Sequence, residues 1–325
     1  PQTTISEQAL SILKNIYNDI GQADKFLDFI KNVDHDYTTM ELDSSTYHAA
    51  ELQYLQLNYQ SSISSFNAYL DYYPDGLFVL NANYYLYKSH YELGQKIDAL
   101  NYLDFIISDK ENQYTVEALM SSADIYYELE KFISSELYFS KLLKLAPSVD
   151  VRRKAVLGLL ESEFQLYKYE DVINDVKSLV EEDFFSGQDN IRIHYLSAYS
   201  YYQTEKYDQS LQDFQWLIYN SDGEVKAESY YYCASILYKQ KKYDKTQKIL
   251  FQLIKELPNY EKWVHEALFL LAQNYIAQED MFQAQHLLLE LDKKSTDNVV
   301  KEKVKKLLEN NFPNTEQDVL MNQNE

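Results

Sequence analysis

The stretch ALFLLAQNYIAQEDMFQAQHLLLEL, residues 267–291, contains two apolar runs separated by a short polar segment, AQED. In each run the apolar residues recur every three or four positions, which is typical of one face of an α-helix. Because the polar segment is so short, the two helices are expected to lie side by side and antiparallel. The stretch therefore predicts a helix, a tight turn and a second helix.

The same arrangement recurs along the chain at a nearly constant period. When the short turns are aligned, one position in each turn, called here the turn marker, falls on Tyr59, Lys96, Phe132, Tyr169, Tyr207, Tyr243 and Met281. Successive markers are 37, 36, 37, 38, 36 and 38 residues apart, so seven units of about 37 residues follow one another. Such a period indicates stacked helix pairs, each of which buries its apolar face against the next.

Small and bulky residues occupy fixed places in these units. Nine residues before the marker, five of the seven units have Ala, and three residues after it every unit has Ser, Ala, Thr or Val. Seven residues after the marker stand the apolar residues Phe66, Leu103, Phe139, Val176, Phe214, Leu250 and Leu288. A proline fifteen residues after the marker ends the second helix in three units, because proline cannot continue it; these are Pro74, Pro147 and Pro258.

Small residues opposite bulky ones, an aromatic at most turns and a terminal proline resemble the tetratricopeptide repeat. The resemblance covers residues 43–295 and implies an all-α, right-handed solenoid of antiparallel helix pairs. The sequence departs from the family pattern because the glycine of the first helix is absent and because Lys96 and Met281 replace the turn aromatic. The stretch WVHEALFLLAQNYIAQ, beginning at Trp263, also resembles long multi-repeat proteins of bacterial cell envelopes, which implies the bacterial periplasm or cell envelope, with the cytoplasm as the alternative.

The predicted organisation has four parts. Residues 1–42 hold a degenerate helix pair and a loop, 43–295 hold the seven repeats, 296–310 form a capping helix and 311–325 form a disordered tail. A capping helix is expected because Val300, Val304, Leu307 and Leu308 form one apolar stripe with lysines around it, and the end of a solenoid needs a polar outer face. The six lysines from Lys293 to Lys306 also suggest head-to-tail contact with the acidic start of another copy, the alternative being a solvated face of the capping helix. The start Pro-Gln-Thr, without Met, suggests a fragment of a longer protein.

Composition and motifs argue against several classes of function. A net charge of −21 disfavours nucleic acid, whose binding depends on Lys and Arg, and no run of about 20 apolar residues predicts a membrane span. Cys233 is the only cysteine; five of the six histidines fall at different places in different units, and His35 is expected in a loop. Phosphate-loop, metalloprotease and nucleophile-elbow motifs are missing. We therefore expect no catalytic residue, no metal site and no cofactor.

The resemblance also implies which residues line the concave groove. In the family the first helix of each pair lines the groove, and the residues five and twelve before the marker face it. These positions lie two helical turns apart and so share one helix face. Here they carry nine tyrosines, called the tyrosine ladder: Tyr47, Tyr54, Tyr84, Tyr91, Tyr127, Tyr195, Tyr202, Tyr231 and Tyr238.

The N-terminal half of the groove is expected to be acidic and the C-terminal half neutral, because the position eight residues before the marker, between the ladder positions, holds Glu51, Lys88, Asp124, Glu161, Tyr199, Ser235 and Gln273. Exposed aromatic side chains are frequent anchors at protein interfaces, and a lined groove accepts an extended peptide or a helix. The sequence thus predicts a non-catalytic scaffold that binds a basic or neutral peptide or protein. Two alternatives remain: a purely structural segment of a longer array, in which the ladder only packs helices, and a module that binds glycan or peptidoglycan.

Overall fold

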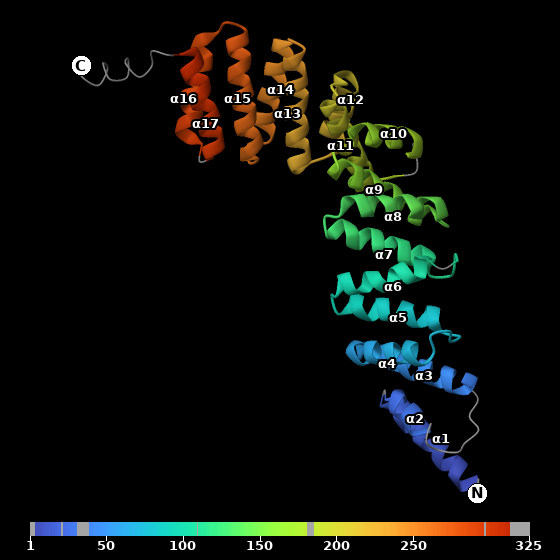
Figure 1. The fold of residues 1–325 in the computed structure, drawn as a ribbon. Coiled ribbons are helices and arrows are strands. Elements are labelled where there is room, and N and C mark those ends of the chain that lie inside the picture. The colour runs from blue at the N-terminus through green and yellow to red at the C-terminus, as the bar shows by residue number, and fades with distance from the viewer. Residues whose placement is uncertain are drawn as a thin grey trace. The chain divides into compact units, whose positions relative to one another are not determined.

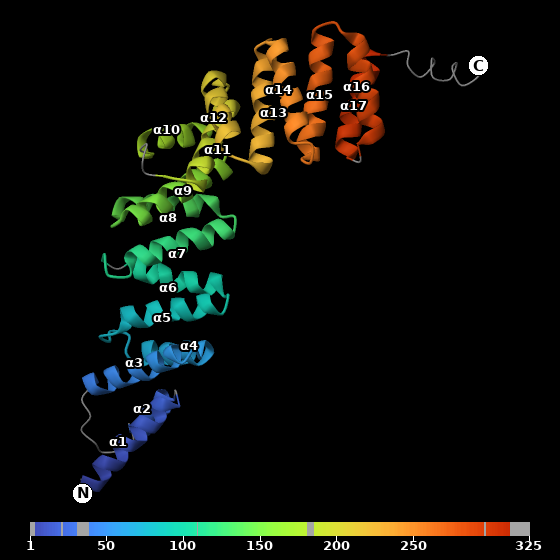
Figure 2. The ribbon, with the colours of Figure 1, turned by 180° about the vertical axis from the view of Figure 1, so that it is seen from behind.

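The computed structural model describes residues 4–20, 22–30, 39–108, 110–180, 185–295 and 297–312. Within these ranges the regular structure consists of seventeen α-helices, α1–α17 (Figure 1; Figure 2 gives the view from behind). A first pair, α1 (Thr4–Asp19) and α2 (Ala23–Ile30), precedes the repeats. The all-α solenoid predicted from the sequence is confirmed.

Seven helix pairs follow. Their first helices are α3 (Thr39–Leu55), α5 (Val79–Glu92), α7 (Thr115–Glu128), α9 (Val149–Gln165), α11 (Gln188–Gln203), α13 (Gly223–Lys239) and α15 (Glu261–Ala277). Their second helices are α4 (Tyr59–Tyr72), α6 (Lys96–Ser108), α8 (Phe132–Leu145), α10 (Tyr169–Leu179), α12 (Tyr207–Asn220), α14 (Tyr243–Glu256) and α16 (Met281–Lys294). Each second helix begins at its turn marker, including the two markers that are not aromatic.

The turn inside each of these pairs has one backbone geometry. The residue two before the marker has a positive φ in all seven turns, and only one of these residues, Gly94, is a glycine. In the first turn the N–H of Leu57 donates to the carbonyl of Tyr54 and the N–H of Asn58 donates to that of Gln53, both at 2.9 Å, and the other six turns repeat both bonds. This is the Schellman motif, which satisfies the last carbonyls of the first helix.

The residues that the repeat pattern places between paired helices are buried. The seven small residues three positions after the marker are all 0% exposed. Two of the buried serines donate to carbonyl oxygens of the facing helix, Ser135 to Ala123 at 3.0 Å and Ser210 to Ala198 at 2.8 Å. Of the bulky residues seven positions after the marker, six are buried and Val176 is half-buried. The two sets lie four residues apart on the second helix of each pair and so share its buried face.

The chain divides into two compact units, Pro1–Ser162 and Glu163–Glu325. In the first unit consecutive helices from α1 to α8 pack against one another, and in the second unit those from α10 to α17 do. The last helix of the second unit, α17 (Asn298–Asn311), lies where a capping helix was predicted; its Val300 and Val304 pack on Leu288 and Leu291 of α16. The predicted disordered tail falls almost entirely outside the described residues. Across the described ranges, no helix is both long enough and apolar enough to cross a membrane.

Candidate functional site

The tyrosine ladder follows one face of the first helices. Tyr91 is 38% exposed, and seven other ladder tyrosines are half-buried: Tyr54, Tyr84, Tyr127, Tyr195, Tyr202, Tyr231 and Tyr238. Half-burial leaves part of each ring open while the rest packs against neighbouring helices. The ladder is therefore a mixed surface, in which packing and exposure coexist in the same side chain.

Tyr47 departs from the prediction, because the structure buries it at 2% exposure. Its ring stacks on Phe78 with centroids 4.4 Å apart and an angle of 13°, and the rings of Phe66 and Tyr69 lie within 6 Å. Phe78 belongs to the segment between α4 and α5, which covers this place on the helix. Tyr47 is a core residue, and its assignment to the groove was wrong.

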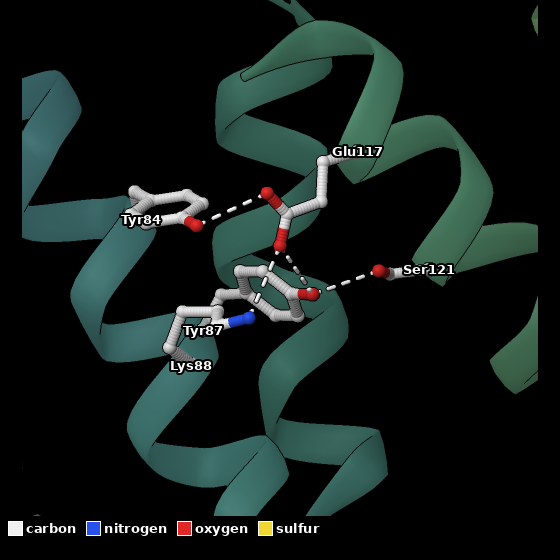
Figure 3. A network of polar contacts seen from close by, with 5 residues as sticks. All are labelled: Tyr84, Tyr87, Lys88, Glu117 and Ser121. Atoms are coloured by element: carbon white, nitrogen blue, oxygen red, sulfur yellow. Dashed lines mark hydrogen bonds and ion pairs between the residues drawn. The ribbon is translucent and has the colours of Figure 1, made fainter.

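In the first unit the ladder joins a polar network around Glu117 (Figure 3). The hydroxyl of Tyr84 donates to the carboxylate of Glu117 at 3.0 Å, and the ammonium of Lys88 lies 3.1 Å from the same carboxylate. Tyr87 donates to Glu117 at 3.4 Å and shares a 2.7 Å hydrogen bond with Ser121. The carboxylate on α7 thus binds three groups that project from α5.

The predicted acidic residues have partners within the chain. Asp124 forms a 2.5 Å ion pair with Lys154, while Glu51 accepts a 3.0 Å hydrogen bond from Tyr47 and lies 3.1 Å from His48. Glu161 is half-buried. Since Lys88 and Lys154 lie on the same face as these carboxylates, the ladder face of the first unit is less acidic than the sequence indicated.

The second unit contains a hollow of ≈ 490 Å³ on its ladder face. Eight aromatic side chains line it: Phe164, Tyr167, Tyr169, Tyr195, Tyr199, Tyr231, Tyr232 and Trp263. The rings contact one another in a continuous series, for example Phe164 with Tyr199 at 5.4 Å, Tyr199 with Tyr232 at 5.6 Å and Tyr231 with Trp263 at 5.6 Å between centroids. Such contacts hold the rings in place and leave their remaining faces toward the hollow.

Four charged residues also line this aromatic hollow: Glu228, Lys262, Glu266 and Lys303. The ammonium of Lys303 on α17 forms a 2.6 Å ion pair with Glu266 on α15. Glu228 accepts a 3.2 Å hydrogen bond from the hydroxyl of Tyr195, and its burial raises the pKa of its carboxyl. Burial, reinforced by the charge of Glu266, raises the pKa of Tyr231 to about 12, so its hydroxyl is a neutral donor at physiological pH.

The described part of the chain shows no group of three or more His, Cys, Asp or Glu that could hold a metal ion. Cys233 is 1% exposed, and burial raises the pKa of its thiol to about 12, which keeps it protonated and unreactive. The geometry offers aromatic surface and a few charges, which suit binding.

The architecture is similar to that of the C-terminal part of a TPR repeat-containing protein from Cytophaga hutchinsonii. The two superpose with a TM-score of 0.56 at 13% identity, over 78% of this chain and 97% of that one. This chain has the tetratricopeptide-repeat fold. At that identity the similarity concerns the fold alone.

Two other solved tetratricopeptide-repeat structures are similar at lower TM-scores. One is YrrB, described as a TPR protein with an unusual peptide-binding site, at 15% identity and TM-score 0.48, over 63% of this chain and 97% of that one. The other is a tetratricopeptide repeat protein from Parabacteroides merdae, at 17% identity and TM-score 0.43, over 81% of this chain and 97% of that one. No family model and no curated protein matches this sequence.

The structure brings three of the predicted groove residues together in the aromatic hollow: Tyr195, Tyr199 and Tyr231. Tyr202 instead bonds to Ser235 at 3.0 Å, and Tyr238 lies against Tyr243. Sequence reasoning missed the carboxylates Glu117, Glu228 and Glu266, which stand fifteen residues before their markers. A signal was present, because positions fifteen, twelve, eight and five before the marker are spaced by three and four residues and so share a helix face.

Proposed function

We propose that this protein is a non-catalytic scaffold that binds a peptide or protein segment on its ladder face, with the aromatic hollow of the second unit as the main anchor. The observation that carries the proposal is the hollow itself, ≈ 490 Å³ lined by eight aromatic side chains. Concave, mostly apolar sites with a few placed polar groups are the usual form of a binding site. Tyr and Trp also supply large contact area at little cost in conformational entropy.

The purely structural alternative assigns the ladder to helix packing alone. Packing accounts for Tyr47, which is buried, and for part of the area of every half-buried ladder tyrosine. It does not account for the open volume between the rings of the second unit, because protein interiors are filled almost without voids. The hollow therefore favours binding over packing at this place.

The test is a selection of displayed random peptides on the full chain, followed by titration of the selected peptides. Trp263 lines the hollow and Trp216 stacks on His194 elsewhere, so a Trp216→Phe background leaves one tryptophan that reports binding. Tyr199→Ser and Tyr231→Ser should each weaken binding about tenfold or more, as expected for aromatic anchors. The matched control is Tyr219→Ser, because Tyr219 is 86% exposed and does not line the hollow.

A selection that yields no binding peptide, or peptides whose affinity is the same for the hollow variants and the control, would contradict the proposal. Short glycan and peptidoglycan fragments titrated against the same Trp263 signal test the carbohydrate alternative. If they bind in place of peptides, and Tyr231→Ser removes that binding, the site is a carbohydrate site.

Self-association and compartment stay predictions. Two lysines of α17 are engaged within the chain, Lys303 with Glu266 and Lys306 with Glu302, which reduces the charge available for a head-to-tail contact. Sedimentation velocity at low and high salt tests self-association, which should weaken with salt if the lysines carry it. Fractionation of the native host tests the periplasm or cell envelope against the cytoplasm.

A further inference from the structure

We infer that the aromatic hollow of the second unit receives a cationic side chain, lysine or arginine, from the bound partner, with Glu228 as its counter-charge. The inference rests on the proposed function, because it names the chemistry of the segment that the same site would bind. It depends on a comparison of equivalent positions in three repeats.

Three repeats carry a glutamate fifteen residues before the marker: Glu117, Glu228 and Glu266. Two of these carboxylates have a lysine of the chain beside them, Lys88 at 3.1 Å from Glu117 and Lys303 at 2.6 Å from Glu266. Within the residues that the structure describes, Glu228 forms no ion pair and only accepts the hydroxyl of Tyr195. One of three equivalent carboxylates thus lacks the cation that the other two have.

The first unit shows how such a cation is held. Lys88 lies 3.1 Å from Glu117 and sits over the rings of Tyr84 and Tyr87, 5.9 and 5.6 Å from their centroids (Figure 3). A carboxylate on one side and aromatic faces on the others stabilise an ammonium by charge and by cation–π attraction. The chain itself therefore contains an occupied version of the site.

The second unit repeats this site without the cation. Tyr195 bonds to Glu228 at 3.2 Å as Tyr84 bonds to Glu117 at 3.0 Å. The position of Lys88, eight residues before the marker, is taken here by Tyr199, whose ring lines the hollow. The carboxylate therefore faces aromatic rings and open volume, and burial raises the pKa of its carboxyl.

Other charges face Glu228 from the neighbouring helices. Arg192 on α11 stacks over Tyr195 at 5.2 Å, Lys262 on α15 stacks over Trp263 at 4.3 Å, and Glu224 lies one turn earlier on α13, where Trp263 donates to it at 3.3 Å. The two cations lower the pKa of Glu228 without an ion pair to it, and Glu224 raises it. Lys262 also lines the hollow, and its movement would supply an internal cation, so the experiment includes it.

The experiment titrates the full chain in the Trp216→Phe background with N-acetyl-lysine methylamide and, as the uncharged match, N-acetyl-norleucine methylamide. The lysine probe should bind at least about tenfold more tightly than the norleucine probe, the scale of a desolvated cation–π contact with a counter-charge. Glu228→Gln, which keeps an acceptor for Tyr195, should remove most of this preference. Equal affinity for the two probes, or a preference that survives Glu228→Gln, would overturn the inference.

Tyr199→Lys provides a sharper test, since it copies the arrangement of Lys88 into the second unit. The new lysine should occupy the site and weaken binding of the lysine probe by at least about tenfold relative to the uncharged control Tyr199→Met, which loses the same aromatic ring. Lys262→Gln should raise the affinity for the lysine probe, because it removes a competing cation. Equal binding of the lysine probe by Tyr199→Lys and Tyr199→Met, or no gain of affinity on Lys262→Gln, counts against the site.

The two proposals fail in different ways. Selected peptides that bind through Tyr231 but contain no required lysine or arginine, or are insensitive to Glu228→Gln, overturn the cation site and leave the scaffold function intact. A selection that yields no peptide, together with a lysine probe whose binding depends on Glu228, contradicts the scaffold function and supports the cation site. Circular dichroism of each variant establishes that the helices are retained.

Discussion

At the level of single residues, the seven repeat turns place an unusual demand on the backbone. Each has a residue with φ between 56° and 73° two positions before the marker, and six of these residues carry a side chain. Left-handed backbone costs an L-residue about 1 kcal/mol or more relative to glycine. The pattern persists without glycine because the two Schellman hydrogen bonds and the packing of the following helix outweigh that cost in every turn.

Gly94→Ala measures the cost directly. A Cβ at Gly94 would meet no other atom within 4 Å, so any loss of stability comes from the backbone conformation alone. We expect the free energy of unfolding to fall by about 1 kcal/mol, measured by urea denaturation. Glu205→Ala at the equivalent place in another turn is the control and should be nearly neutral, because both residues carry a Cβ. Equal effects of the two substitutions would refute this account.

The pH dependence of stability tests the state of Glu228. Its folded-state pKa lies above the ordinary value of 4.5 because of burial, so folding favours the protonated carboxyl. The contribution of Glu228 to the free energy of unfolding therefore falls as pH rises from the ordinary pKa through the raised one, and stays lower above it. Glu228→Gln should be more stable than wild type at pH 7, and the difference should shrink as pH falls toward 4.5. Thermal melts of both proteins at pH 7 and at pH 4.5 measure this difference in stability. A difference that grows on acidification would contradict the raised pKa of Glu228.

At the level of elements, the contact between α8 and α9 depends on one glycine. A Cβ at Gly158 of α9 would overlap the ring of Phe139 of α8, which is 3% exposed. Alanine in place of glycine ordinarily stabilises a helix interior by roughly 0.5–1 kcal/mol. At this position the close approach of the two helices reverses that expectation.

We expect Gly158→Ala to lower the free energy of unfolding by about 1–3 kcal/mol, the usual cost of overpacking. The matched variant is Gly158→Ala combined with Phe139→Leu, in which the smaller side chain makes room for the methyl group. The double variant should lose less stability than the sum of the two single variants, a coupling that a double-mutant cycle measures. Additive losses, or a Gly158→Ala variant more stable than wild type, would show that the helices do not approach so closely.

At the level of the whole molecule, the division into two units predicts that a core defect acts mainly on its own unit. Phe214 and Phe66 occupy the same position of the repeat in different units, and both are 0% exposed. Both tryptophans, Trp216 and Trp263, belong to the second unit. Tryptophan fluorescence therefore follows the second unit, whereas circular dichroism follows all helices.

Phe214→Ala should cost about 3–5 kcal/mol and lower the urea midpoint read by tryptophan fluorescence. Phe66→Ala should shift the unfolding of the first unit, read by circular dichroism, to lower urea concentration. It should leave the urea midpoint read by tryptophan fluorescence nearly unchanged. Identical shifts of both signals in both variants would mean that the chain unfolds as one cooperative unit.

Much of the fold was predictable because it depends on local, repeated sequence. The turn markers coincide with the first residues of seven helices, even at Lys96 and Met281, since the period of the apolar pattern defines the turn irrespective of the residue at the marker. The burial of the small residues after the marker follows from the same periodicity. The candidate site was predictable only in part: Tyr195, Tyr199 and Tyr231 line the hollow, whereas Tyr47 lies in the core.

The sequence by itself determined the helix pairs, their turns, their core positions and the helix face that carries the tyrosines, because each depends on spacings within a single unit. Only the tertiary structure decided which tyrosines leave open volume between them and that Phe78 covers Tyr47. It also decided that Lys303 reaches Glu266 across 37 residues of sequence, and that Glu228 has no such lysine partner among the residues that the structure describes. The physical reason is that burial and ion pairing depend on side chains of neighbouring helices. The distances between those side chains are set by packing, which the period of one repeat does not contain.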